Sequence, residues 1–231
     1  MKSCIITGAS QGIGRATAVK MSYEEGIKNI ALIARNADNL NKTKELMNPK
    51  CNVIVVPHDM MDLDGIEDVV DNIYKEFGAI DLLINGAGFV NPTALLDTTN
   101  ENFERTFTIN TVSMLVMIRS CVRYMKGRDA KILNIASTAG STSRPGWVAY
   151  AAAKAGVISL SKTLADELRG YKIKVYCISP GRCATELRRI LAPEEDPTTI
   201  MQPEDVADVI ANLLSSGENC LDGQDIVVRQ K

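Results

Sequence analysis

The stretch Thr7-Gly8-Ala9-Ser10-Gln11-Gly12-Ile13-Gly14 follows a short apolar run, Ser3–Thr7, and leads directly into a helical pattern. Glycines allow the backbone to turn sharply between a strand and a helix, and they let a phosphate approach the free amide groups of the helix N-terminus. The position of this loop predicts a dinucleotide-binding βαβ unit, with a tight turn that binds no ligand as the alternative. The residues that we expect to bind a pyrophosphate are Gly8, Ser10, Gln11, Gly12, Ile13 and Gly14.

The rest of the chain repeats this alternation of short apolar runs and longer helical patterns. The further strands are expected at Asn29–Ala34, Asn52–Pro57, Leu82–Asn85, Lys131–Ala136, Ile173–Ser179 and Gln224–Val228. Helices are expected near Ile13–Glu25, Ala37–Met47, Leu63–Phe77, Asn102–Met125, Trp147–Arg169 and Pro203–Leu214. Such alternation is typical of parallel strands joined by right-handed crossovers. We therefore predict one Rossmann-type α/β domain over residues 1–231, with a doubly wound parallel sheet of about seven strands and helices on both faces.

Composition excludes several classes of function. A net charge of −2, with both signs interspersed, gives no support to nucleic-acid or membrane-surface binding. The six cysteines are scattered, without the spacing of a metal site or a disulfide scaffold, so we expect reduced thiols and no metal. Because the apolar strand pattern begins within three residues of Met1 and no long apolar run follows, we expect no signal peptide, no membrane span and a cytoplasmic location.

The residues after the second and third strands indicate which dinucleotide binds. Leu32-Ile33-Ala34-Arg35 has no carboxylate for a ribose 2′-hydroxyl, whereas Arg35 suits a 2′-phosphate. We therefore predict NADP(H) in preference to NAD(H), unless Arg35 is a solvated loop residue. Asp59, followed by Met60, is a candidate for binding the adenine, with a helix N-cap as the alternative for Asp59. The single histidine, His58, precedes any plausible nucleophile, which argues against a Ser-His-Asp hydrolase.

A candidate catalytic group follows the fifth strand. Ser137 lies at the carboxyl end of that strand, and thirteen residues later comes Tyr150-Ala151-Ala152-Ala153-Lys154. Positions four apart share one face of a helix, so the Tyr150 phenol and the Lys154 ammonium are expected to lie together. A nearby cation lowers the pKa of a phenol, which would let Tyr150 transfer a proton while Ser137 holds the substrate oxygen. This combination predicts hydride transfer between a nicotinamide and a carbonyl or alcohol carbon.

These residues, with Thr7–Gly14, resemble the classical short-chain dehydrogenase/reductase family over essentially the whole chain. The resemblance implies that Lys154 also bonds the nicotinamide ribose and that Asn110, in Thr108-Ile109-Asn110-Thr111, supports a water in the proton relay. The family's Asn-Asn-Ala-Gly appears here as Asn85-Gly86-Ala87-Gly88, a departure that puts one local contact in doubt. By the same resemblance, the residues beside the cofactor are Asn85, Gly86, Ala87, Pro180, Gly181 and Thr185.

The surroundings of this site bear on the substrate. The segment Cys183–Gln202 is predicted to be a mobile flap, and the short sequence after the last strand predicts an open cleft. The general pattern is nearest to the family's 3-ketoacyl-carrier-protein reductases, so a small-molecule or carrier-bound carbonyl substrate is expected. One group of residues is basic: Arg123, Lys126, Arg128 and Lys172. This group either meets an acidic carrier or forms a solvated helix end. Candidate wall residues are Phe89, Leu95, Thr138, Trp147, Arg144 and Arg182; an inward Arg144 or Arg182 would favour a phosphorylated or carboxylated substrate.

The favoured interpretation is an NADPH-dependent reductase of a ketoacyl or similar carbonyl substrate. One alternative is an NADP-dependent dehydrogenase of a sugar or polyol, free or phosphorylated, and another is a regulatory protein that senses NADP(H) without turnover. The patterns Phe103–Met125 and Trp147–Leu168 are apolar on more than one face. Resemblance to the family implies that these helices form a homodimer, often doubled into a homotetramer; helices that only face the core are the alternative.

Overall fold

The computed structural model describes residues 1–215 and 217–230. Its centre is one parallel sheet in the order β3-β2-β1-β4-β5-β6-β7. The strands are β1 (Lys2–Thr7), β2 (Ile27–Ala34), β3 (Asn52–Pro57), β4 (Leu82–Asn85), β5 (Ala130–Ile135), β6 (Ile173–Pro180) and β7 (Asp225–Val228). Every residue of β4 and β5 is buried, as expected for strands covered on both faces. The predicted fold class is therefore confirmed.

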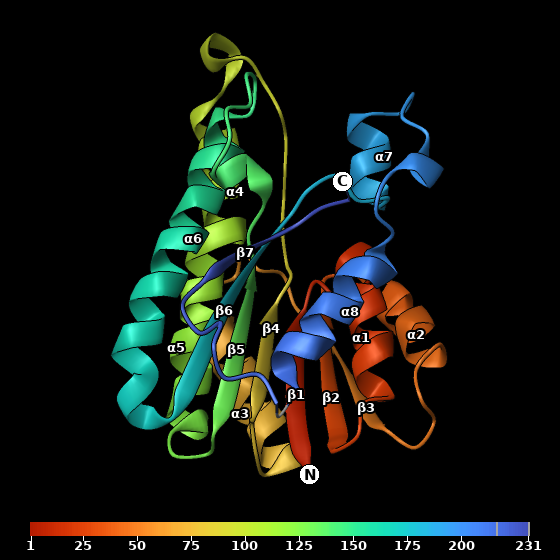
Figure 1. Ribbon diagram of the computed structural model, residues 1–231, viewed down its shortest axis with the longest axis vertical. Coiled ribbons are helices and arrows are strands. Elements are labelled where there is room, and N and C mark those ends of the chain that lie inside the picture. Colours follow the sequence, from red (N-terminus) through yellow and green to blue (C-terminus); the bar gives the residue numbers. More distant parts are fainter. Residues whose placement is uncertain (216, 231) are drawn as a thin grey trace.

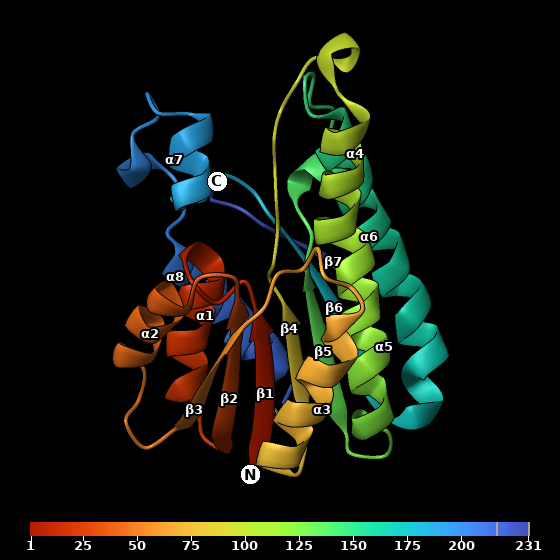
Figure 2. The same cartoon turned by 180° about the vertical axis from the view of Figure 1, so that it is seen from behind.

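Helices cover both faces of the sheet (Figures 1 and 2). On one face lie α1 (Gly12–Ser22), α2 (Ala37–Glu45) and α8 (Pro203–Leu214). On the other lie α3 (Gly65–Phe77), α5 (Ser113–Met125) and α6 (Val148–Leu168), with α4 (Asn100–Phe107) above α5. Each layer has its own apolar core, one on each side of the sheet.

The strand order reverses between β1 and β4. From β1 the chain builds β2 and β3 on one side and then returns to β4 on the other side of β1. At such a point the connections leave in opposite directions, which opens a crevice above the carboxyl ends of the strands. This edge of the sheet faces upward in Figure 1 and lies below α4 and the short helix α7 (Glu186–Leu191).

Two helical predictions needed correction. The pattern predicted as one helix over Asn102–Met125 is divided into α4, a π-helical turn at Thr108–Val112 and α5. The segment predicted as a flap contains α7, which the sequence pattern did not indicate, and its ends are joined by a bridge between Cys183 and Met201. Within the described part of the chain, no helix has the length and apolar character needed to cross a membrane.

Candidate active site

A cavity of about 530 Å³ lies over the carboxyl ends of the strands. The β1–α1 loop forms one end, and all six of the predicted pyrophosphate residues, from Gly8 to Gly14, line it. The first turn of α1 contains no acidic residue, and the N-cap Gln11 makes no side-chain cap hydrogen bond. The helix therefore presents amide groups that are available to an anion, as a bound pyrophosphate requires.

Glycines allow the β1 and β4 loops to touch. Gly8 has a φ of +70°, and a Cβ there would lie 2.5 Å from the carbonyl oxygen of Gly86. A Cβ on Gly86 would in turn lie 2.9 Å from the carbonyl oxygen of Thr7. The Thr7 hydroxyl accepts hydrogen bonds from the amides of Gly86 and Ala87, each at 3.1 Å. The glycine that replaces the family's second asparagine thus fits a close contact between backbones.

The ends of β2 and β3 supply the next part of the cavity. Arg35, Asp59 and Met60 all line it, and Arg35 is exposed. Asp59 accepts a hydrogen bond from the amide of Met61 at 3.0 Å, while α3 begins only at Gly65, so Asp59 is not the N-cap of that helix. His58 also lines the cavity, and its Nε2 lies 3.0 Å from the carbonyl oxygen of Asp62.

Ser137, Tyr150 and Lys154 meet at the other end of the same cavity. Ser137 follows β5 in an extended conformation, and its hydroxyl accepts a hydrogen bond from the amide of Ala139 at 3.2 Å. Tyr150 and Lys154 lie one turn apart on α6. Lys154 is buried, and its Nζ donates to the carbonyl oxygen of Ile135 at 2.8 Å. The strand end thus holds the ammonium in place beneath the tyrosine.

The electrostatics differ from the expectation that Lys154 lowers the pKa of Tyr150. Burial raises the pKa of Tyr150 to about 12, and a hydrogen bond with Ser137 opposes this only in part. Burial also lowers the pKa of Lys154 to about 8. The Lys154 Nζ lies 5.8 Å from the centre of the Tyr150 ring and is bonded to a backbone carbonyl. Desolvation therefore outweighs the attraction between the two groups in this structure.

Asn110 lies in the π-helical turn between α4 and α5 and is fully buried. Its Nδ2 donates to the carbonyl oxygens of Phe89, at 2.7 Å, and Thr106, at 2.8 Å. Its Oδ1 accepts from the amide of Phe89 at 3.3 Å. The neighbouring Thr111 hydroxyl donates to the carbonyl oxygen of Ala153 at 3.0 Å, which ties the turn to α6 beside Lys154. Asn110 thus fixes the backbone of a cavity residue, Phe89.

The other predicted cofactor residues divide into two groups. Gly86, Ala87, Pro180, Gly181 and Thr185 line the cavity. Asn85 is not among the described residues that line it, since its Nδ2 donates into the sheet, to Asn134 Oδ1 at 2.9 Å. The direct cofactor contact predicted for Asn85 therefore lacks geometric support.

The candidate wall residues are largely where the sequence suggested. Phe89, Thr138, Trp147, Arg144 and Arg182 line the cavity. The prediction that Leu95 lines the cavity was wrong, because Leu95 lies in a 3-10 turn, is 71% exposed and is not among the described lining residues. The sequence missed Leu187, Arg188 and Leu191 on α7, and no periodic signal in so short a helix indicated them.

The basic group proposed for a carrier lies elsewhere. Arg128 and Lys172 precede β5 and β6, so they lie at the amino end of the sheet, away from this chain's cavity. Arg128 pairs with Asp81 at 3.1 Å, and Arg123 pairs with Glu67 at 2.5 Å and with Asp71 at 3.2 Å. Much of the charge is therefore compensated within the chain.

A nucleotide loop, a switch-point cavity and a Ser-Tyr-Lys group together define a nicotinamide-dependent oxidoreductase of the Rossmann class. The chain belongs to the short chain dehydrogenase family, which matches residues 2–196. Its curated relatives include the 3-oxoacyl-[acyl-carrier-protein] reductase FabG of Thermotoga maritima, 34% identical, with 96% of this chain and 94% of the relative covered. The 2,3-dihydro-2,3-dihydroxybenzoate dehydrogenase of Bacillus subtilis is 29% identical, with 93% and 89% covered.

Solved structures agree with this assignment. A levodione reductase superimposes with a TM-score of 0.90 at 25% identity, covering 99% of this chain and 96% of the other. A short-chain type dehydrogenase/reductase from Mycobacterium marinum gives a TM-score of 0.90 at 29% identity, with 98% and 93% covered. The protein is therefore an enzyme, and its family implies a nicotinamide cofactor. The amides of α1, which no side chain caps, and a cavity lined by both the glycine loop and the Ser-Tyr-Lys group fit such a cofactor.

Proposed function

We propose that this enzyme reduces a carbonyl group with NADPH and that its substrate is a ketoacyl compound or a similar ketone. The observation that carries the proposal is the convergence of Ser137, Tyr150 and Lys154 on one cavity with the glycine loop. The similarity to a 3-oxoacyl-[acyl-carrier-protein] reductase at 34% identity supports the substrate class. The substrate is free or attached to a carrier.

Each residue of the group has one task. The Ser137 hydroxyl donates a hydrogen bond to the substrate oxygen and positions it near the phenol. The Tyr150 hydroxyl protonates that oxygen as negative charge develops on it. The Lys154 ammonium, beneath the tyrosine, stabilises the phenolate that remains, and Asn110 holds the Phe89 backbone at the cavity wall. The nicotinamide, when bound, supplies the hydride.

We also propose NADP(H) as the cofactor. The pyrophosphate would be held by the amides from Gly8 to Gly14. A 2′-phosphate would be held by Arg35, which is exposed and lines the cavity directly after β2, where Leu32–Asn36 contains no carboxylate. Asp59 and Met60 would contact the adenine, while Pro180, Gly181 and Thr185 would lie beside the nicotinamide.

The reverse reaction is a second candidate function. The similarity to a dihydrodiol dehydrogenase supports oxidation of an alcohol, such as a sugar or polyol, at the same site. Family membership argues against the alternative of a regulatory protein that senses NADP(H) without turnover. The cytoplasmic location and the single-domain organisation stay predictions.

A panel of ketones tests the function. Acetoacetyl thioesters and ketose phosphates are incubated with NADPH, and its absorbance is followed for the wild type and for Tyr150→Phe. Loss of the phenolic proton is expected to reduce kcat/KM by about a hundredfold to ten-thousandfold, because proton transfer is worth about that factor. Tyr171→Phe, an exposed tyrosine away from the cavity, is the matched control. Undiminished turnover by Tyr150→Phe rejects the proposed acid.

We further propose a homodimer, alone or doubled into a homotetramer, formed through α4, α5 and α6. These helices lie together on one side of the molecule (Figure 1). They and the π-helical turn between α4 and α5 carry exposed apolar side chains: Phe103, Val112, Leu115 and Val148. An exposed apolar group of this kind is typical of an interface.

A further inference from the structure

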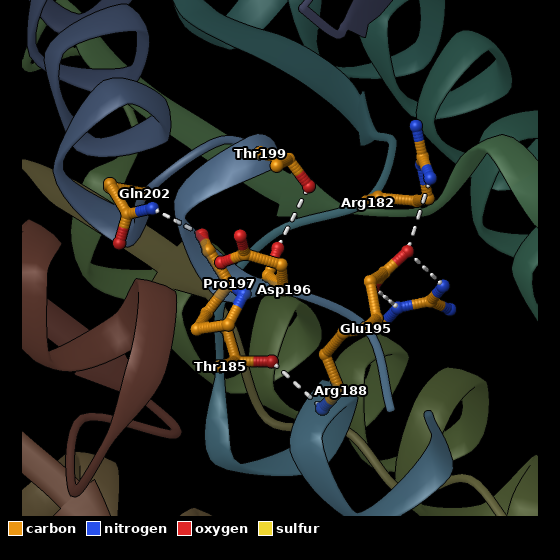
Figure 3. Close-up of polar contacts among 8 residues, drawn as sticks. All are labelled: Arg182, Thr185, Arg188, Glu195, Asp196, Pro197, Thr199 and Gln202. Carbon is orange, nitrogen blue, oxygen red and sulfur yellow. Dashed lines mark hydrogen bonds and ion pairs between the residues drawn. The ribbon is translucent and has the colours of Figure 1, made fainter. Parts of the chain in front are cut away.

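Arg182 and Arg188 share one carboxylate at the cavity wall. Arg188 binds Glu195 through two hydrogen bonds, Nε to Oε2 at 2.6 Å and Nη2 to Oε1 at 2.9 Å. Arg182 donates from Nη1 to the same Oε1 at 3.1 Å. Figure 3 shows the three side chains converging on one side of the segment, with Pro197 and Gln202 on the other. The two guanidinium groups are thus held together by a single acidic side chain.

This cluster has an excess of positive charge. One carboxylate faces two guanidinium groups, and Arg144 lines the same cavity. Among the described lining residues the only carboxylate is Asp59, which follows β3. Four strands, β2, β1, β4 and β5, separate β3 from β6, and Arg182 lies between β6 and the flap. Among the described residues that line the cavity, none near α7 carries a carboxylate that could neutralise the remaining charge.

Arg188 and Glu195 form a largely buried pair, and Arg182 joins them from a more exposed position. The Glu195 side chain is only 16% exposed, and Arg188 is 25% exposed. The pair with Arg188 holds the pKa of Glu195 below its usual range. Arg182 is 60% exposed and makes one hydrogen bond to Glu195, so most of its five donors face the cavity or solvent. Leu187 and Leu191, one turn apart on α7, line the cavity beside Arg188.

We propose that Arg182 and Arg188 form a subsite for an anionic group of the substrate, with Glu195 as the residue that positions them. This inference rests on the proposed reductase function and narrows its substrate to a ketone with a carboxylate or phosphate. Guanidinium groups recognise both anions through paired hydrogen bonds. The anion belongs either to a small keto acid or to the phosphate of a long carrier arm.

Two pairs of ketones distinguish these sources. Levulinate and methyl levulinate share a methyl ketone and differ in charge close to it. Acetoacetyl-coenzyme A and the acetoacetyl thioester of N-acetylcysteamine share the acyl group and the start of the arm, and they differ in the remainder of the arm, which carries the phosphates. The quantity measured is the ratio of kcat/KM for the charged compound to that for the neutral one. Arg182→Gln and Arg188→Gln are each expected to lower this ratio about tenfold in one pair, and that pair identifies the source.

Arg189→Gln is the matched control, because Arg189 is also on α7 but is 74% exposed, pairs with Glu186 and is not among the described lining residues. It is expected to leave both ratios unchanged. Arg188 also supports the flap, so Arg182→Gln carries the test if Arg188→Gln fails to fold. Unchanged ratios in both pairs overturn the inference. A fall in NADPH affinity in Arg182→Gln also overturns it, because the arginine would then serve the cofactor.

A binding measurement separates this inference from the proposed function. Trp147 is the only tryptophan in the sequence and lines the cavity, so its fluorescence reports occupancy without turnover. Each compound of the two pairs is titrated into the wild type and the variants. Tighter binding of a charged compound, lost in Arg182→Gln, supports the subsite even if no ketone is reduced. Reduction of ketones without any such selectivity supports the function and rejects the subsite.

Discussion

At the scale of single residues, Lys154 is buried at the cavity with its ammonium bonded to the Ile135 carbonyl. Burial lowers its pKa from 10.5 to about 8, so folding works against the charged form that the proposed mechanism needs. A catalytic site of this kind is expected to reduce stability, because a buried cation is retained for its chemistry.

We expect Lys154→Met to be inactive but to raise the free energy of unfolding by about 2 kcal/mol near neutral pH. The unfolded chain keeps the lysine protonated up to 10.5, whereas the folded protein releases the proton near 8. Wild-type stability therefore rises with pH across this window, and the advantage of the variant shrinks there. Urea denaturation at both ends of the window measures the difference, with the exposed Lys162→Met as control. A variant less stable than the wild type at neutral pH contradicts the argument.

Arg35 is the second residue with a direct test. Arg35→Asp replaces a cation suited to a 2′-phosphate by a carboxylate suited to a ribose hydroxyl. The ratio of NADPH to NADH affinity, from the fluorescence of the bound nucleotides, is expected to fall at least about tenfold. Lys42→Asp on α2, exposed and not among the described lining residues, controls for the general change in charge. Equal NADPH affinity in Arg35→Asp and the wild type would remove the basis for the NADP(H) assignment.

At the scale of elements, the strands were predictable and some of the helices were not. β3 and β4 have the predicted bounds, because a short run of β-branched and aliphatic residues strongly favours an extended conformation. The π-helical turn at Thr108–Val112 leaves no mark on the apolar pattern, since it depends on the hydrogen bonds of Asn110 to Phe89. α7 depends on the Thr185 cap and on the pair between Arg188 and Glu195, which are contacts that periodicity does not record.

In the candidate site too, features set by the local sequence were predictable, and features set by tertiary contacts were not. Its glycine loop, Ser137, Tyr150 and Lys154 were found from the sequence because each follows a strand or shares a helix face. The raised pKa of Tyr150 was not predictable from the sequence, because desolvation depends on everything packed around the phenol. Arg188 was missed for a similar reason, since its relation to the cavity comes from the fold of the flap.

At the scale of the whole molecule, the two sides differ in how their apolar side chains are covered. α4, α5 and α6 form one side, while α2 lies on the opposite side (Figure 1). Leu115, 46% exposed, lies in the first turn of α5. Val112, directly before α5, and Val148, the first residue of α6, are also exposed. Leu46, 56% exposed at the end of α2, is of the same type on the opposite side. A dimer through the first side buries Leu115 and leaves Leu46 in solvent.

Leu115→Glu is therefore expected to weaken the dimer about a hundredfold or more, because each subunit would bury an unpaired carboxylate at the interface. Glutamate is a good helix former, so the substitution leaves α5 intact. Leu46→Glu, which adds the same charge on the far side, is expected to sediment as the wild type does at micromolar concentration. A wild type that sediments as a monomer, or a Leu115→Glu variant that remains a dimer, rules out an interface through α4, α5 and α6. If Leu115→Glu remains a dimer, the two subunits associate through a different surface of the molecule, and the exposed side chains of α4, α5 and α6 do not form the dimer interface.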